Sequence, residues 1–195
     1  MKLLTKIYVF LILFGAINTT IAQQYNFKNY SAKNGLASSI VNNIFQDSKG
    51  YIWFATQGGG VSRFNGKTFK TLSKADGLIS NDVTYITEDK KGKYLDSNSE
   101  GVSKFNGISF TNYSPKDGLS KGVVYWILAD KNNTIWFAIQ DGGVNKFDGK
   151  VFQKFTQKDG LPTESVYSIA EDKLGDIWFA TAKVLLNLME KNNQL

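Results

Sequence analysis

Short apolar and aromatic runs alternate with polar turns along this chain, and the stretch from residue 35 to residue 77 shows one complete unit of that pattern. Apolar, aromatic and β-branched residues gather in runs of four to six, which is typical of β-strands. Glycine and polar residues separate these runs, and Asn65-Gly66 is a strong signal for a tight hairpin. The pattern predicts four antiparallel strands, at residues 40–45, 51–56, 61–64 and 68–72.

The same unit recurs along the chain at a nearly constant step. Gly-Leu occurs at residues 35, 77, 118 and 160, at intervals of 42, 41 and 42 residues. An acidic residue follows in register at Asp47, Asp89, Asp130 and Asp172. A period near 40 residues that is built from four short strands indicates one propeller blade per repeat. The predicted fold is all-β, a propeller of about four four-stranded antiparallel blades spanning residues 23–181.

The two ends of the repeat region leave the completeness of the ring open. Residues 25–30 match an outer strand, whereas the last repeat supplies its first two strands and then becomes an atypical tail at residues 182–195. The apolar run at residues 184–188 is expected to add a strand and to meet residues 25–30, closing a four-bladed ring. The alternative is an incomplete ring or a fragment of a larger propeller.

One position in the second repeat departs from the pattern. Asp96 stands where Phe54, Phe137 and Phe179 stand in the other repeats. A charged residue in an aromatic column is expected to weaken that blade unless the position faces solvent or a ligand.

Residues 1–22 have the plan of a secretory signal peptide, with lysines first, then a short apolar run, then small residues. Removing them lowers the net charge from +6 to +4, and the remaining lysines are scattered rather than clustered. We therefore expect an exported protein, periplasmic or secreted, with no membrane span in the mature chain and no nucleic-acid partner. The chain has no cysteine, so its fold needs no disulfide.

The composition also restricts the chemistry. The chain contains neither histidine nor cysteine, which excludes Ser-His-Asp and Cys-His catalysis and the common zinc sites. The recurring aspartates occupy equivalent turns, where a structural role is typical. We expect no enzyme activity, no catalytic residue, no metal site and no cofactor.

The fourth repeat resembles the two-component regulator propeller repeat, because it reads Asp159-Gly160-Leu161, then Val166, Ile169, Asp172, Gly175 and Trp178-Phe179-Ala180-Thr181. The resemblance implies a relative of the periplasmic sensors of hybrid two-component regulators in Bacteroidetes-type bacteria, several of which respond to carbohydrate fragments. This chain departs from that plan, since it has no membrane helix after the repeats, fewer blades and no histidine to accept a phosphoryl group.

Candidate ligand-binding residues lie where the repeats vary, at the start of each inner strand. That end of a blade faces the central channel, and exposed aromatic rings there suit sugars or other small ligands. The candidates are Asn81, Asp82, Tyr85, Tyr125, Trp126, Glu164 and Tyr167. A packing role between blades remains open for the aromatic candidates. Two functions follow from these features: a ligand-binding sensor module for an oligosaccharide or another small ligand, or an interaction module that completes its ring with a protein partner or by homo-oligomerisation.

Overall fold

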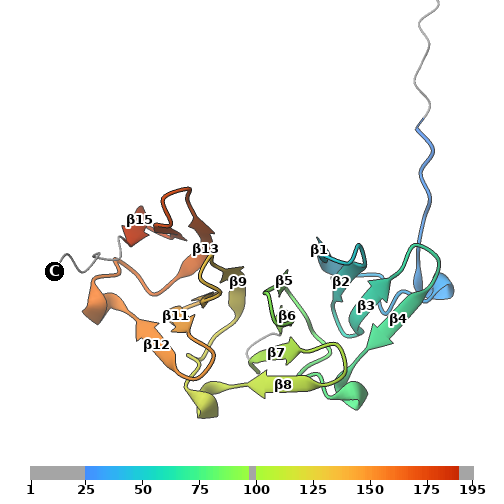
Figure 1. Cartoon of the computed structure of the whole chain (residues 1–195), viewed down its shortest axis with the longest axis horizontal. Coiled ribbons are helices and arrows are strands. Elements are labelled where there is room, and N and C mark those ends of the chain that lie inside the picture. Colours follow the sequence, from blue (N-terminus) through green and yellow to red (C-terminus); the bar gives the residue numbers. More distant parts are fainter. Residues whose placement is uncertain (1–24, 97–99, 189–195) are drawn as a thin grey trace, which may run out of the picture.

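A computed structural model describes residues 25–96 and 100–188, and the chain forms an open arc of four antiparallel sheets (Figure 1). The predicted signal peptide at residues 1–22 lies outside the described residues. In every sheet the strands are hydrogen-bonded in sequence order, as in the blades of a propeller.

The strands fall where the hydrophobic pattern predicts them. The first blade contains β1 (Val41–Gln46), β2 (Ile52–Thr56), β3 (Gly60–Phe64) and β4 (Phe69–Leu72). The second contains β5 (Ile86–Glu88), β6 (Lys93–Asp96), β7 (Val102–Phe105) and β8 (Phe110–Tyr113). The third contains β9 (Val124–Ala129), β10 (Ile135–Ile139), β11 (Gly143–Phe147) and β12 (Phe152–Phe155). The fourth contains β13 (Val166–Glu171), β14 (Ile177–Thr181) and β15 (Leu185–Leu188).

A single turn of 3-10 helix precedes each inner strand. These turns are η1 (Ala32–Asn34), η2 (Lys74–Asp76), η3 (Pro115–Asp117) and η4 (Gln157–Asp159). In the second of them, Asp76 Oδ2 accepts hydrogen bonds from the Ser73 backbone N–H at 2.9 Å and from Ser73 Oγ at 3.0 Å. Gly77 ends the turn with φ of 100°, a left-handed conformation that favours glycine. The Gly-Leu column is therefore the place where the chain leaves one blade and enters the next.

Apolar layers between neighbouring blades form the core. The layer between the first two blades contains Trp53, Ala55, Val61, Leu72, Leu78, Val83, Ile86 and Phe105, and equivalent layers separate the second blade from the third and the third from the fourth. Each blade is therefore stabilised by its neighbours.

The ring does not close, and the expectation of a closed four-bladed ring is wrong. The tail strand forms as expected, since β15 pairs with β14 from Ile177↔Leu188 to Ala180↔Leu185. Residues 25–30, however, form no strand and lie at the opposite end of the arc from β15 (Figure 1). The four described blades span only part of a ring (Figure 1). The structure is an incomplete propeller.

Asp96 ends β6 opposite Val102, so the second blade keeps its sheet despite the acid in an aromatic column. Across the described part of the chain, no helix has the length and apolar character needed to span a bilayer.

Candidate functional site

The inner strands β1, β5, β9 and β13 line the concave side of the arc (Figure 1). Three of the seven predicted site residues lie on inner strands: Tyr125 and Trp126 on β9, and Tyr167 on β13. The other four precede these strands, Asn81, Asp82 and Tyr85 before β5 and Glu164 two residues before β13. The structure places them in four kinds of surroundings, so they do not form one continuous site.

Tyr125 and Tyr167 form an aromatic pair in which Tyr167 is exposed and Tyr125 is half-buried. They come from the neighbouring inner strands β9 and β13, and their ring centroids are 5.7 Å apart with 40° between the ring planes. Tyr167 is 49% exposed, which is uncommon for an aromatic residue within a strand of this chain. The Tyr167 ring therefore leaves part of its apolar face open to a ligand.

Tyr85 and Trp126 form a packed aromatic pair. Their ring centroids are 4.7 Å apart. Tyr85 packs against the buried layer between the second and third blades, and Trp126 packs against the layer between the third and fourth. Burial raises the pKa of the Tyr85 hydroxyl above its ordinary value. In the described conformation this pair connects blades.

Asn81 and Asp82 hold turns in place. Asn81 Oδ1 accepts a 2.8 Å hydrogen bond from the Lys74 N–H, and Asp82 Oδ1 accepts one of 2.7 Å from the Gly58 N–H in the first blade. The Asp82 carboxylate therefore links the second blade to the turn between β2 and β3.

Glu164 has a different environment. Its backbone carbonyl accepts a 2.9 Å hydrogen bond from the Gly143 N–H, which joins the fourth blade to the third. Its carboxylate accepts no hydrogen bond from the described part of the chain. Glu164 lies only three residues before Tyr167, so its carboxylate is the ionic group nearest in sequence to this exposed ring.

A larger hollow lies elsewhere, and the sequence reasoning missed it. It has a volume of about 610 Å³ and contains none of the seven predicted residues. Turns and strand ends of the first three blades line it, and the lining residues include Lys49, Glu88, Lys90, Lys91, Asn106 and Asn133. Its size falls within the range of small-molecule sites.

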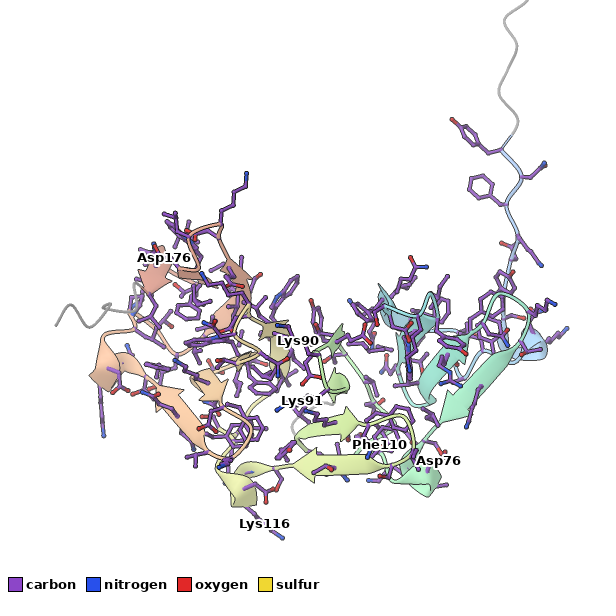
Figure 2. All side chains as sticks on the ribbon, viewed as in Figure 1. Asp76, Lys90, Lys91, Phe110, Lys116 and Asp176 are labelled. Carbon is purple, nitrogen blue, oxygen red and sulfur yellow. The ribbon has the colours of Figure 1, made fainter. Side chains whose placement is uncertain are left out.

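The charges around this hollow are partly fixed. Glu88 accepts a 2.7 Å hydrogen bond from the Ser48 N–H, and Asp89 pairs with Lys104 Nζ at 3.0 Å. No ion pair joins the ammonium groups of Lys90 or Lys91 to residues 25–96 or 100–188. Figure 2 shows these two lysines in the middle of the arc, between the second and third blades.

One sequence signal could have indicated this hollow. The second repeat has Leu95 where the other three repeats have tryptophan, and it alone has two lysines directly after its aspartate, Lys90 and Lys91. A lost tryptophan beside clustered cations distinguishes the second repeat from its sisters.

The recurring aspartates are structural, as their turn positions predict. Asp130 Oδ1 accepts hydrogen bonds from the N–H groups of Asn132 at 2.9 Å and Thr134 at 2.8 Å, and Oδ2 accepts one from Trp136 Nε1 at 2.9 Å. Their lone pairs are engaged, so they are poorly placed for acid–base chemistry. Among the described residues, no group of three or more acidic residues is arranged to hold a metal ion.

Comparison with known proteins identifies the repeat. The family described as "Two component regulator propeller" matches residues 35–58 and 160–183. No curated protein sequence matches the chain. Among solved structures, the chain is similar to the extracellular domain of a hybrid two-component system from B. thetaiotaomicron, with 26% identity and a TM-score of 0.71 over 84% of this chain and 24% of that one.

Two further structures share the fold at lower identity. One is the extracellular domain of a one-component system from B. thetaiotaomicron, with 19% identity and a TM-score of 0.69 over 86% of this chain and 25% of that one. The other is a catalytically inactive virginiamycin B lyase from Staphylococcus aureus, with 17% identity and a TM-score of 0.59 over 86% of this chain and 56% of that one. The chain spans about a quarter of the length of the two B. thetaiotaomicron domains.

Proposed function

Because the chain carries repeats of the two-component regulator propeller family, we propose that it is an exported ligand-binding module related to sensors and that it catalyses no reaction. The observation that carries the proposal is the 26% identity to the extracellular domain of a hybrid two-component system across 84% of this chain. That similarity supports an extracytoplasmic location and a role in sensing.

Tyr125 and Tyr167 are the proposed centre of the ligand site. Their ring centroids lie 5.7 Å apart, they belong to neighbouring inner strands, and Tyr167 is 49% exposed. Aromatic faces pack against the C–H faces of sugar rings, while carboxylates such as that of Glu164 accept hydrogen bonds from hydroxyl groups. An oligosaccharide is therefore the ligand class that these residues suit best.

The absence of catalytic residue types supports a binding role. The chain contains no histidine and no cysteine, and the described aspartates of the recurring column are held by turn hydrogen bonds. Propeller enzymes exist, as the lyase comparison shows, so cleavage activity has to be measured directly.

The lysine-lined hollow supports a second location for the ligand. Lys49, Lys90 and Lys91 line it together with Glu88, Asp89 and Asp130. The three carboxylates are engaged by Ser48, Lys104 and Thr134, which leaves the lysines to meet an acidic small molecule such as a uronic-acid oligosaccharide. The aromatic pair instead predicts binding that does not depend on ligand charge.

Calorimetric titration with matched neutral and acidic oligosaccharides tests the proposal. We expect Tyr125→Ala/Tyr167→Ala to weaken binding of a neutral oligosaccharide about tenfold or more. Lys90→Ala/Lys91→Ala and the surface variant Val151→Ala serve as controls that leave it unchanged. Binding lost only in the lysine variant would move the site to the hollow, and the absence of binding together with cleavage of the oligosaccharides would overturn the function itself.

A further inference from the structure

Within the described residues the fourth blade has no outer strand, and residues 25–30, which match an outer strand in sequence, pair with no sheet. Among the described residues the fourth sheet has three strands, with β15 at its outer edge. The backbone N–H and C=O groups along such an edge are available to a further strand. Residues 25–30 leave the first blade on the open side of the arc (Figure 1).

The sequence register shows what residues 25–30 correspond to. In each complete blade the outer strand begins with a phenylalanine, which lies four positions before the serine or threonine that caps the next 3-10 turn. Counting back from Ser31, the cap of η1, this position is Phe27. Phe27 is therefore the counterpart of Phe69, Phe110 and Phe152.

Tyr30 already occupies the place that it would have in a larger ring. Its ring lies 5.3 Å from that of Phe64 and 5.6 Å from that of Phe69, both in the first blade. Its counterpart Tyr113, at the end of an outer strand, lies 4.9 Å from Phe147 in the following blade. The end of the N-terminal segment is thus docked as an outer strand is docked, although the segment has no blade to pair with.

The fourth blade contains an empty socket for Phe27. In the other blades, the phenylalanine that begins the outer strand covers the glycine of the Gly-Leu pair. A Cβ placed on Gly35 would lie 3.3 Å from Phe69, one on Gly77 would lie 3.7 Å from Phe110, and one on Gly118 would lie 3.6 Å from Phe152. Figure 2 shows Phe110 beside Asp76, the residue before Gly77.

Gly160 is the exception among these glycines. A Cβ placed there meets no atom of the described residues within 4 Å. A hollow of about 110 Å³ lies at this place, lined by Gly160, Leu161, Phe179, Leu186 and Leu188 among others. Phe27, which would fill it, is 88% exposed.

The two end faces of the arc are complementary as well. Ile44 on the first blade is 62% exposed, whereas its counterparts Ile86, Ile127 and Ile169 are at most 2% exposed because each packs against the preceding blade. At the other end, Trp178 of the fourth blade is half-buried, whereas Trp53 and Trp136 are buried against the following blade. Each end exposes the apolar surface that the other end would cover.

We propose that a second copy of this chain completes the ring, with residues 25–30 of each copy pairing as the outer strand of the fourth blade of the other. Two arcs of four blades make a ring of eight, within the range that propellers use, typically 4–8 blades. The same interface then forms twice around a two-fold axis and leaves no end open.

The register of the exchange follows from the complete blades. Because Phe64 pairs with Phe69 and Val61 with Leu72, Phe27 is placed opposite Leu188, and Tyr30 opposite Leu185. Lys28 is then opposite Asn187, whose Oδ1 is buried and accepts no hydrogen bond from the described residues. A directly opposed lysine is close enough to donate one.

The first test is the mass of the purified chain by light scattering. We expect a dimer, twice the mass of the single chain, that dissociates on dilution. Phe27→Asp or Leu186→Asp is expected to weaken the dimer roughly 100-fold, because each places a carboxylate in the apolar socket. Ile108→Asp is the matched control: Ile108 is 93% exposed but lies in a hairpin turn far from the socket, so its replacement leaves the dimer intact.

The second test is a disulfide across the exchanged strands. The chain has no cysteine of its own, so only the introduced thiols can form one. Lys28→Cys and Asn187→Cys are prepared as separate proteins, mixed and oxidised. We expect a covalent dimer from the mixture and little from either protein alone. Circular dichroism of each variant confirms that the sheets are retained.

Three outcomes would overturn the proposal. These are a monomer at every concentration, a dimer that Phe27→Asp leaves intact, and an oxidised mixture of Lys28→Cys and Asn187→Cys that yields no more covalent dimer than either protein alone. None of them depends on whether the module binds an oligosaccharide, so this inference and the proposed function fail separately.

Discussion

Asp47 Oδ2 accepts a 2.7 Å hydrogen bond from Trp53 Nε1, six residues further along the chain. Asp47 Oδ1 accepts two more from the backbone N–H groups of Lys49 and Tyr51, both at 2.9 Å. The buried carboxylate thus closes the turn between β1 and β2 and also orients the indole that packs against the second blade. One residue holds a turn within a blade and positions a contact between blades.

Asp47→Ala is expected to destabilise the protein by about 3 kcal/mol, because it leaves the indole and two backbone donors without their acceptor in a buried site. Asp148→Ala is the matched control. Asp148 also accepts hydrogen bonds from two backbone N–H groups, but it is exposed, so water replaces it at a cost below about 1 kcal/mol. Urea denaturation followed by circular dichroism compares the two variants. Equal losses would show that the indole contact contributes nothing.

In the second blade the equivalent carboxylate, that of Asp89, has a different partner. Leu95 replaces the tryptophan, and Lys104 Nζ lies 3.0 Å from Asp89 Oδ2, with the Asp89 side chain 1% exposed. Lys104→Met is expected to cost about 3 kcal/mol, because it leaves a buried carboxylate without its cation.

Two further variants identify the cause of that loss. Lys74→Met removes the exposed pair with Glu100 and is expected to cost less than about 1 kcal/mol. Lys104→Met/Asp89→Asn removes both charges and is expected to recover part of the loss. If the double variant is less stable than Lys104→Met alone, the pair is not the reason for the effect.

The periodic pattern predicted the blades closely, because glycine and hairpin signals act locally within about 42 residues. The strands expected at 51–56 and 68–72 correspond to β2 (Ile52–Thr56) and β4 (Phe69–Leu72). The Asp–Trp contact was missed, although its constant spacing of six residues was visible at Asp130 and Trp136.

The shape of the ring could not be predicted in the same way. The angle between blades depends on how side chains fill the layer between two sheets, and the repeat pattern does not show this. The surroundings of Asp82 were missed for a related reason, since its partner, the Gly58 N–H, belongs to the preceding blade. Contacts within a repeat follow from the sequence, whereas contacts between repeats depend on packing.

Polar side chains at equivalent positions of β3, β7 and β11 connect these strands to the segment that follows each Gly-Leu pair. Ser62 Oγ accepts a 2.8 Å hydrogen bond from the Ala37 N–H, and Asn145 Oδ1 accepts one of 2.7 Å from the Ser120 N–H. Asn145→Leu is expected to cost about 2 kcal/mol, because the Ser120 N–H is left buried without an acceptor.

The control is Asn145→Ser, which places at this position the residue type found at Ser62. It should keep most of the stability that Asn145→Leu loses. Thermal melting of the two variants gives the comparison. Equal melting temperatures would show that the loss comes from altered packing rather than from the missing acceptor.

Asp172 makes the stability of the fourth blade dependent on pH. Hydrogen bonds from Trp178 Nε1, at 2.9 Å, and from backbone N–H groups of the turn hold the pKa of this carboxyl below its ordinary value. A group whose pKa is lowered on folding stabilises the protein above its unfolded pKa of about 3.9, and this stability is lost as the pH falls through the folded pKa. We therefore expect Asp172→Asn to be less stable than the unmodified chain at pH 6 and the gap to narrow below about pH 3.9.

Trp178→Phe is the complementary variant, since it removes the indole donor and keeps the carboxyl. The pKa of Asp172 should then rise towards its ordinary value, and the acid-dependent loss of stability should begin at a higher pH. Denaturation across a pH series measures the stability, and NMR titration of the Asp172 carboxyl carbon measures the pKa. A stability gap between Asp172→Asn and the unmodified chain that is constant from pH 6 to strong acid would contradict this account, because a contribution that does not change with pH cannot come from the ionised carboxylate.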